Sequence, residues 1–423
     1  MLEPVAVPPL ALADYEPFVG ATAVAEIRAL AAPLRDARVL HVNATAYGGG
    51  VAELLPTLVG LMRDVGLAAE WRVISGEEAF FNVTKALHNG LQGMDVQLND
   101  AMRDTYHRGQ LRIAAAFEGD YDFVIVHDPQ PAGLRRLLPE APGAWIWRCH
   151  IDLTTADPTV WAFLRPEIEA HDAAIFTLPE YVQPDLALDV LAFIPPAIDP
   201  LSPKNQTVSE QVLAAILGRF GADPARPLLL QVSRFDPWKD PLGVIDMYRR
   251  VKAEVPAVQL ALVGSMATDD PEGWRIYQQV LRYAGLDDDL LVLTNLDGVH
   301  APEVAAFQQA ATVVVQKSLR EGFGLTVSEA LWKGRPVVGG RVGGIPMQLG
   351  DTGGRLVTSV DEAVVACLEL LRDATLRRQL GEGGRERVRR HFLSTRDLRD
   401  HLALLAALRS GDRSLLPRGI GGS

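Results

Sequence analysis

The length, composition and charge of the chain define its broad class. With 423 residues, 48% of them hydrophobic and 22% charged, it has the composition of a folded globular protein. That length is enough for two domains of the usual size, roughly 100 to 200 residues each. The formal net charge of −12 argues against nucleic acid or an anionic membrane as a partner, because both favour broad basic surfaces.

The cysteine content and the N-terminal segment indicate the compartment. Only Cys149 and Cys367 are present, too few for a disulfide framework, so we expect a reducing environment. The start of the chain, "MLEPVAVPPLALADYEPF", lacks the basic residues and continuous apolar stretch of a secretory signal. Nor does any apolar run reach the roughly 18 residues of a membrane span. We therefore expect a soluble cytoplasmic protein without a membrane partner.

Short β-rich apolar runs alternate with longer helical patterns in the first half of the chain. This alternation predicts parallel strands joined by crossover helices, and hence an α/β domain. The predicted strands are 37–43, 69–75, 121–128, 143–150 and 172–178.

The same rhythm returns after a proline-rich segment, "FIPPAIDPLSPKNQ", in which neither a helix nor a strand continues well. The second set of predicted strands is 227–235, 258–264, 289–295, 311–317 and 335–340. We expect an N-terminal domain (1–195), a linker (196–205), a second domain (206–390) and a C-terminal helix with a frayed tail (391–423) that packs back on the first domain. Two such sheets predict a cleft between the domains, beyond the carboxyl ends of the strands.

Three consecutive glycines, Gly48, Gly49 and Gly50, separate a predicted strand from a helix that begins near Val51. Glycine allows close backbone approach, and the start of a helix offers N–H groups to an anion or a sugar oxygen. The pattern is neither a dinucleotide fingerprint nor a P-loop. A flexible turn without a ligand explains it equally well.

His150 and Asp152 follow another predicted strand in "WRCHID". If the extended backbone persists, both side chains face the same side, where His150 is placed to bind a hydroxyl. A hydrogen-bonded core histidine is the structural alternative, and the same two interpretations apply to His127 and Asp128. The sequence has no H-E-x-x-H or C-x-x-C spacing, which disfavours a metal site.

Two cations occupy one loop after a strand of the second half. In "QVSRFDPWKDP", Arg234 and Lys239 are placed to neutralise a diphosphate, the arginine as a fork and the lysine as a point charge. A surface loop in which they pair with Asp236 and Asp240 is the alternative.

Three further segments leave strands of the second half. Loops at Gly264 and Asn295 are typical of a nucleotide-base pocket but are not specific alone. In "REGFGLTVSEALWKG" a glycine turn leads into a helix closed by Gly334. The turn offers N–H groups to a phosphate, and the first glutamate can accept hydrogen bonds from sugar hydroxyls. The alternative role of the second glutamate is a capping box with Thr326. The segment contains Glu321, Gly322, Phe323, Gly324, Leu325 and Glu329.

These motifs carry a resemblance to known proteins. The Glu-x7-Glu pattern of "EGFGLTVSE", preceded by "SRFDPWK", resembles retaining GT-B glycosyltransferases that use sugar nucleotides. Over about residues 38 to 395 the chain resembles the trehalose glycosyltransferring synthases within that group. Fungal-type trehalose phosphorylases share "SRFDP" and are the nearest alternative. The motifs of the closer resemblance are "GGGVAELLP", "WRCHID", "VSRFDPWKDP", "DDPEGW", "LTNLDGVHAPEVAAFQ" and "REGFGLTVSEALWKGRPVVGGRVGGI".

The resemblance implies a GT-B architecture, two Rossmann-like doubly wound domains facing a central cleft. It also implies transfer of glucose from ADP-, UDP- or GDP-glucose to free glucose, giving α,α-trehalose with retention and no cofactor beyond the donor. The expected partners are these small molecules and trehalose, with a homodimer left open. The alternatives are a trehalose phosphorylase, another retaining GT-B glucosyltransferase, or a catalytically silent module that binds a sugar nucleotide.

The resemblance also implies roles for the singled-out residues. Arg234 and Lys239 would stabilise the leaving diphosphate, Glu321 would hold the donor glucose and Glu329 the ribose. The rest of the donor site would be Gly322, Phe323, Gly324, Leu325, Gly264 and Asn295. His150, which we count with the catalytic residues, would line the sugar side with Asp152, Gly48, Gly49 and Gly50. The sequence assigns no role to Lys317, nor to Gly343 and Gly344 beside a shortened loop.

Overall fold

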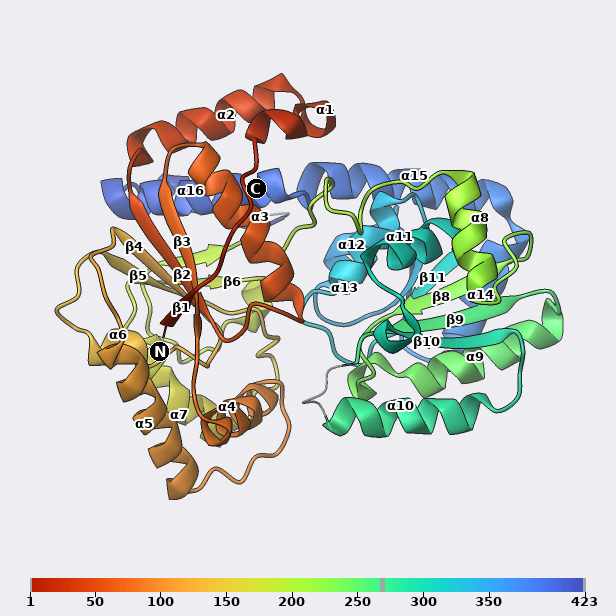
Figure 1. The fold of residues 1–423 in the computed structure, drawn as a ribbon, viewed down its shortest axis with the longest axis horizontal. Helices are drawn as coiled ribbons and strands as arrows, with labels where there is room; N and C mark the ends of the chain where they lie inside the picture. The colour runs from red at the N-terminus through yellow and green to blue at the C-terminus, as the bar shows by residue number, and fades with distance from the viewer. Residues whose placement is uncertain (1, 267–270, 421–423) are drawn as a thin grey trace. The chain divides into compact units, whose positions relative to one another are not determined.

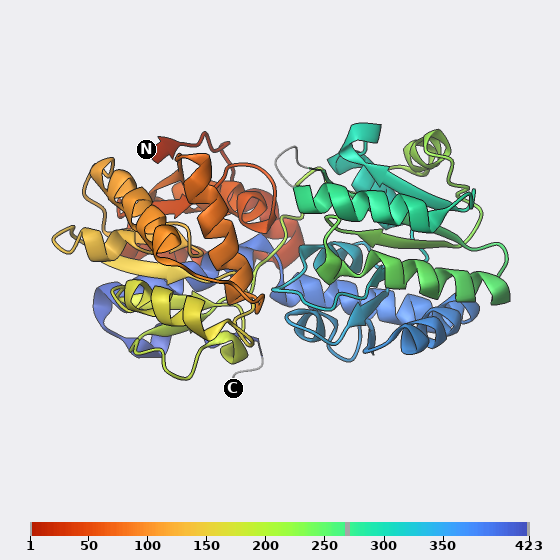
Figure 2. The same cartoon turned by 90° about the horizontal axis from the view of Figure 1, so that it is seen from below.

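The computed structural model describes residues 2–266 and 271–420, and its chain divides into two compact units (Figure 1, Figure 2). The first unit is made of Met1–Ala197 together with Ser394–Ser423, and the second of Ile198–Leu393. The chain therefore passes from one unit to the other twice. Asp269 and Asp270 of the "DDPEGW" motif lie outside the described residues.

The first unit is built on a sheet of seven strands in the order β1-β3-β2-β4-β5-β6-β7. All neighbours are parallel except β1, which pairs antiparallel with β3. From β2 the strand order runs outward to β3 on one side, and from β4 it runs outward to β7 on the other side. The strand order therefore reverses between β2 and β4. The strands are β1 (Leu2–Pro4), β2 (Arg38–Asn43), β3 (Ala68–Ile74), β4 (Phe123–His127), β5 (Ala144–Arg148), β6 (Ala173–Phe176) and β7 (Leu191–Phe193).

Helices connect these strands and cover the sheet. One group, α4, α5 and α7, packs on an apolar core, while α2 and α3 pack with α16, which returns from the C-terminal end of the chain (Figure 1). The helices are α1 (Glu16–Val19), α2 (Ala21–Ala31), α3 (Gly50–Asp64), α4 (Glu78–Leu91), α5 (Asp100–Ala115), α6 (Leu134–Leu137), α7 (Pro158–Ile168) and α16 (Ser394–Ser410).

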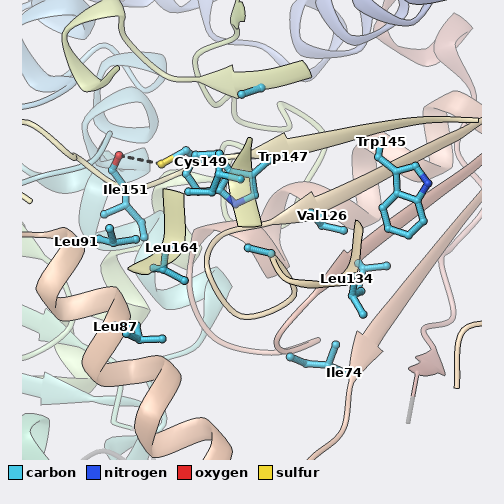
Figure 3. Packing of buried hydrophobic residues seen from close by; sticks show 14 of the residues in the cluster. Ile74, Leu87, Leu91, Val126, Leu134, Trp145, Trp147, Cys149, Ile151 and Leu164 are labelled. Carbon is cyan, nitrogen blue, oxygen red and sulfur yellow. Dashed lines mark hydrogen bonds between the residues drawn. The ribbon is translucent and has the colours of Figure 1, made fainter. Parts of the chain in front are cut away.

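One apolar cluster of the first unit lies on the face of the sheet that α4, α5 and α7 cover. Trp145 and Trp147 of β5 are fully buried and belong to a cluster to which α4 and α7 contribute aliphatic side chains (Figure 3). Cys149 is also fully buried, and its Sγ donates to Ile151 O at 3.4 Å. Burial raises the pKa of the Cys149 thiol well above its usual value. Cys149 is therefore an inert packing residue, consistent with its place in this cluster.

The second unit repeats the plan with a fully parallel sheet of six strands, in the order β10-β9-β8-β11-β12-β13. The strand order runs outward from β8 to β10 on one side and from β11 to β13 on the other. The reversal of the strand order therefore lies between β8 and β11. The strands are β8 (Leu228–Val232), β9 (Gln259–Gly264), β10 (Leu290–Thr294), β11 (Val313–Gln316), β12 (Val337–Gly340) and β13 (Gly354–Val357).

The second unit buries its own apolar core, to which α9, α10 and α14 contribute. The helices are α8 (Glu210–Arg219), α9 (Pro241–Glu254), α10 (Pro271–Ala284), α11 (Ala301–Ala310), α12 (Leu325–Trp332), α13 (Ile345–Leu349), α14 (Val360–Arg372) and α15 (Ala374–His391). Short 3-10 turns complete the chain: η1 (Leu12–Tyr15), η2 (Ala32–Leu34), η3 (Pro179–Tyr181), η4 (Pro237–Lys239), η5 (Asn295–Asp297) and η6 (Arg413–Leu415).

The C-terminal segment is divided between the two units. Its charged helical pattern breaks at Phe392 and Leu393, both fully buried, into α15 and α16. The two helices belong to different units, with α15 in the second and α16 in the first. Of the helices that the structure describes, none is both long and apolar enough to cross a membrane.

Candidate active site

Lys239 and Glu321 are 82 residues apart in the chain and form an ion pair in the second unit. Lys239 Nζ donates to Glu321 Oε2 at 2.6 Å, and Ser318 Oγ donates to the same oxygen at 3.2 Å. Both side chains are largely buried, with 17% of Lys239 and 9% of Glu321 exposed. Lys239 ends η4, which follows β8, while Glu321 follows β11.

The sheet topology explains this meeting. Because β8 and β11 are neighbouring parallel strands, their carboxyl ends lie side by side at the point where the strand order reverses. The two loops are joined by a backbone hydrogen bond from Leu319 N to Trp238 O at 2.7 Å. In open α/β sheets, the crevice at such a reversal is where ligands bind.

A second cation, Lys317, is bound to the same loop. Its side chain is 6% exposed and forms an ion pair with Asp240 Oδ2. Asp240 adopts a left-handed conformation with φ of 50° and caps α9 by accepting from Gly243 N at 3.1 Å. The buried pair therefore fixes the residue that directly follows Lys239. Sequence reasoning gave Lys317 no role, because its partner is 77 residues away.

Arg234 lies in the same loop but takes no part in the ion pair of Lys239 and Glu321. Its side chain is 61% exposed, and its Nη2 lies 3.7 Å from Asp236 Oδ2. This contact is the one expected for a surface loop. For Lys239 and Asp240 the surface-loop alternative is wrong. Lys239 pairs with the buried Glu321, and Asp240 pairs with the buried Lys317.

The glycine turn before α12 has the geometry expected of a tight approach. Gly324 is the N-cap of α12, with φ of 84° and ψ of 72°, a left-handed conformation that favours glycine. A Cβ at this position would lie 3.1 Å from Glu321 Cδ. Phe323 is buried and packs against Phe392, with ring centroids 5.6 Å apart. The turn thus places Glu321 directly beside the first residues of α12, among them Leu325.

Glu329 is almost completely buried inside α12, where 1% of it is exposed. Lys204 Nζ donates to its Oε1 and Gln308 Nε2 to its Oε2, both at 2.8 Å. Lys333 Nζ completes the cluster by donating to Gln308 Oε1 at 2.9 Å. Burial alone would raise the pKa of Glu329, but Lys204 and Lys333 together hold it below its usual value. The capping-box alternative is wrong, because α12 is capped at Gly324 and Thr326 lies inside the helix.

Gly264 ends β9, and Asn295 directly follows β10, the neighbouring strand of the second sheet. A Cβ on Gly264 would lie 2.4 Å from Phe235 Cε2, so the glycine makes room for a buried ring. Asn295 Oδ1 accepts from Met266 N at 2.7 Å, and its Nδ2 donates to Met266 O at 3.2 Å. Both residues therefore shape the loops at the carboxyl ends of β9 and β10.

In the first unit, Gly48 and Gly49 have φ of 71° and 89°, and α3 begins at Gly50. A Cβ on either of the first two would meet nothing within 4 Å. The backbone conformation, and not the available space, is therefore what requires glycine in this turn.

His150 and Asp152 do not share the face of an extended strand, because β5 ends at Arg148 and the chain then turns. His150 N donates to Asp128 Oδ1 at 2.8 Å, and His150 Nε2 lies 3.0 Å from His127 Nδ1. Asp152 Oδ1 accepts from Thr154 N at 2.9 Å and from Thr154 Oγ1 at 2.6 Å. His150 thus lies at the carboxyl end of the sheet but is bound to other polar groups.

Asp128, which receives the His150 backbone N–H, has two unusual properties. Its φ of 62° is left-handed, and burial raises the pKa of its carboxyl to about 7 in spite of the His150 hydrogen bond. The segments that contain Asp128 and His150 follow β4 and β5. They adjoin the reversal between β2 and β4, the equivalent of the position that Lys239 and Glu321 occupy in the second unit.

Comparisons with known families agree with the division into two α/β units. Residues 41–183 match the family model described as "Trehalose synthase, N-terminal domain", and residues 216–387 match "Glycosyl transferases group 1". Sucrose-phosphate synthase from Thermosynechococcus elongatus has a similar structure, with a TM-score of 0.69, 18% identity, and coverage of 89% of this chain and 100% of that chain. The fold and these matches define the protein as a glycosyltransferase of the GT-B architecture, a class that uses a sugar-nucleotide donor.

Individual relatives show to which family within this class the chain belongs. A protein named trehalose synthase from Rubrobacter xylanophilus is 53% identical over 94% of this chain and 97% of the relative. One of the same name from Thermococcus litoralis is 48% identical over 93% and 96%. A trehalose phosphorylase from Pleurotus pulmonarius is 28% identical, and the match covers 89% of this chain but 58% of that protein. The chain belongs to the trehalose synthase family.

Proposed function

We propose that the protein transfers glucose from a nucleoside diphosphate glucose to free glucose and forms α,α-trehalose with retained configuration. The observation that carries this proposal is the 53% identity to a trehalose synthase over nearly the whole of both chains. The ion pair of Lys239 and Glu321, at the strand-order reversal of the second sheet, supports it independently.

The second unit supplies the groups that the donor needs. Departure of a nucleoside diphosphate develops negative charge, which fixed cations and helix-end N–H groups stabilise without reorganisation. Lys239 is held in place by Glu321, and Arg234 on the same loop is exposed and free to move toward the diphosphate. Gly322 to Leu325 bring the start of α12 to the same place, where N–H groups favour phosphate.

Glu321 acts in this proposal as a hydrogen-bond acceptor for the donor glucose and not as a nucleophile. Its Oε2 already receives both Lys239 and Ser318, which lowers the availability of that oxygen for attack on carbon. Retaining glycosidases place a nucleophilic carboxylate opposite the leaving group. We propose instead attack on the same face, with the leaving phosphate taking the proton of the acceptor hydroxyl.

The remaining residues bind the rest of the substrates. Glu329 receives the ribose hydroxyls, which requires that it exchange part of its contact with Lys204 or Gln308. Gly264 and Asn295 shape the base pocket. On the first unit, Gly48 to Gly50, His150 and Asp152 bind the sugars.

The reaction itself is tested by a donor screen. Incubation with glucose and ADP-, UDP- or GDP-glucose should yield a non-reducing disaccharide and release the nucleoside diphosphate. Trehalose with inorganic phosphate and no nucleotide is the parallel assay. Product from the second assay alone would identify a phosphorylase, and product from neither would overturn the proposal.

The role of Glu321 is tested by Glu321→Gln. The variant loses the carboxylate charge that fixes Lys239, so we expect kcat to fall on the order of 100-fold, the size of effect seen when one preorganised electrostatic contact is removed. Glu382→Gln, a change on the exposed face of α15, is the matched control and should keep the normal rate. A Glu321→Gln enzyme within twofold of the parent would show that this carboxylate does not contribute to turnover.

A further inference from the structure

Three histidines of the first unit form a continuous hydrogen-bonded chain. His41 Nδ1 lies 3.1 Å from His127 Nε2, and His127 Nδ1 lies 3.0 Å from His150 Nε2. The rings are stacked, with centroids 5.3 Å apart in both pairs. His41 belongs to β2, His127 ends β4 and His150 follows β5, so the chain crosses three neighbouring strands at the reversal of the sheet.

Two rings of the chain are buried, and the third, His150, is half-buried. His41 is 0% exposed and His127 is 3% exposed. Burial, the larger effect, and the nearby His401 together lower the pKa of His41 to about 3. Burial also lowers the pKa of His127 and of His150 well below the usual value, and Arg148 contributes to both. All three imidazoles are therefore neutral at physiological pH.

Neutral imidazoles in such a chain are not independent of one another. Each ring carries one N–H and one bare nitrogen, and each hydrogen bond needs one of each. Only two arrangements satisfy both bonds. Either all three rings carry the proton on Nδ1, or all three carry it on Nε2. The proton position on His150 is thus coupled to that on His41, two rings away.

The unpaired end of the chain distinguishes the two arrangements. His41 Nε2 is buried and, among the described residues, has no hydrogen-bond partner. With the protons on Nδ1 this atom is a bare acceptor, and with the protons on Nε2 it is an unpaired N–H. Buried N–H groups without a partner are rarer in proteins than under-satisfied acceptors. The Nδ1–H arrangement is therefore favoured.

We propose that His41 and His127 are positioning residues that hold His150 in its Nδ1–H tautomer, so that His150 offers a hydrogen-bond donor to a sugar oxygen. His150 Nε2 is occupied by His127, which leaves Nδ1 as the nitrogen for a ligand. The backbone bond from His150 N to Asp128 Oδ1 fixes the residue at its other end. The sugar as ligand rests on the proposed function, whereas the tautomer does not.

The tautomer is measured directly by NMR of the full chain labelled with 15N-histidine. Long-range proton–nitrogen correlations at pH 7.5 should show a protonated Nδ1 and a bare Nε2 for all three rings, assigned with single His→Gln variants. Signals of the Nε2–H form, or averaged signals from exchange between both forms, would overturn the proposal. This measurement needs neither donor nor turnover, so it remains decisive if the protein fails every donor assay.

Two variants of His41 separate positioning from packing. His41→Leu removes the donor to His127 Nε2, so the two remaining rings are free to take either tautomer. We expect averaged His150 signals and kcat/KM lower by about tenfold, the equivalent of one hydrogen bond. His41→Asn keeps an N–H close to the position of Nδ1 and should restore the single tautomer and most of the rate.

His171→Gln is the control, because His171 is buried in the same unit but lies outside the chain, bound to Glu167 O and Ile168 O. It should leave the His150 signals and kcat/KM unchanged. Circular dichroism of each variant establishes that the fold is retained. A folded His41→Leu protein with an unchanged His150 tautomer and rate would refute the positioning role.

Discussion

Buried histidines make the first unit sensitive to acid. Burial lowers the pKa of His41 to about 3 and that of His171 to about 4, from an ordinary value of 6.5. Between pH 6.5 and these values the unfolded chain binds more protons than the folded chain. The contribution of these neutral histidines to the free energy of unfolding is therefore fully present above pH 6.5. It is lost as the pH falls from 6.5 toward the lowered pKa values.

We predict that the free energy of unfolding of the first unit falls steeply between pH 6.5 and 4. Each such histidine adds up to about 1.4 kcal/mol per pH unit. His171→Gln should remove that share of the slope and leave the curve parallel to the parent above pH 7. Urea titrations at several pH values, read by hydrogen exchange on peptides of β5 and β6, resolve this unit from the other. Equal slopes for parent and variant would show that His171 does not titrate on unfolding.

The contacts of single residues show what the sequence alone predicts and what depends on the tertiary fold. The sequence pointed to Lys239 and Glu321 by their positions after strands, and the structure brings them together. It gave no sign that Glu329 is held by Lys204 and Gln308, which are 125 and 21 residues away. Neither spacing matches a helix or strand period, so the contacts depend on the tertiary fold. The chain of His41, His127 and His150 escaped notice for the same reason, although each histidine lies at or near the end of a predicted strand.

At the scale of elements, the ten predicted strands all occur, and each end lies within three residues of its prediction, because continuous apolar runs mark buried parallel strands. The three strands that sequence reasoning missed are β1, β7 and β13, all with three or four residues. Each lies at an edge of its sheet, where one side is unpaired and a long apolar run is not required.

Glycines in α15 allow that helix to pack closely on its neighbours. A Cβ on Gly381 would lie 2.1 Å from Gly334 O, and one on Gly384 would lie 2.6 Å from Leu331 Cδ2. Gly334 lies two residues beyond the end of α12, so α15 packs against the backbone at the end of the helix that carries Glu329.

Gly381→Ala should therefore destabilise the second unit by about 2 kcal/mol, in the range for overpacking against groups that cannot move aside. Gly218→Ala in α8 is the matched control, because a Cβ there meets nothing within 4 Å. That change should stabilise the unit by roughly 0.5–1 kcal/mol through helix propensity. Hydrogen exchange of peptides from α12 and α8 measures both. Stabilisation by both alanines would mean that α15 has room to shift.

At the scale of the whole molecule, the second unit is inserted into the first. Ile198–Leu393 is one continuous stretch, whereas the first unit needs Ser394–Ser423 in addition to Met1–Ala197. Most of α16 is buried, and its His401 ring lies 6.5 Å from that of His41. Asp397 of α16 raises the pKa of Arg148, although burial, the larger effect, lowers it to about 10. The helix thus covers the face of the first sheet that carries His41 and Arg148.

The two crossings of the chain lie next to each other. Ile198 N donates to Phe392 O at 2.8 Å, and Ile198 forms a parallel bridge with Leu393, which implies a separation of roughly 5 Å between the two segments. On the side of the first unit, Arg396 Nη2 donates to Pro196 O at 3.3 Å and Arg396 Nη1 to Asp400 Oδ2 at 2.9 Å. A short linker is therefore long enough to join Ala197 to Ser394.

This arrangement predicts which fragments fold. Residues 198–393 should fold alone, because their sheet and core are complete. Residues 1–197 should not, because without α16 the buried Arg148 loses Asp397 and the face that carries His41 is opened to water. Joining residues 1–197 to 394–423 through about four Gly and Ser residues should restore a cooperative thermal transition, measured by near-ultraviolet circular dichroism, to which Trp145 and Trp147 contribute. If 1–197 alone unfolds at the same temperature as the joined protein, α16 contributes no stability to the first unit, and Met1–Ala197 with Ser394–Ser423 is not a folding unit.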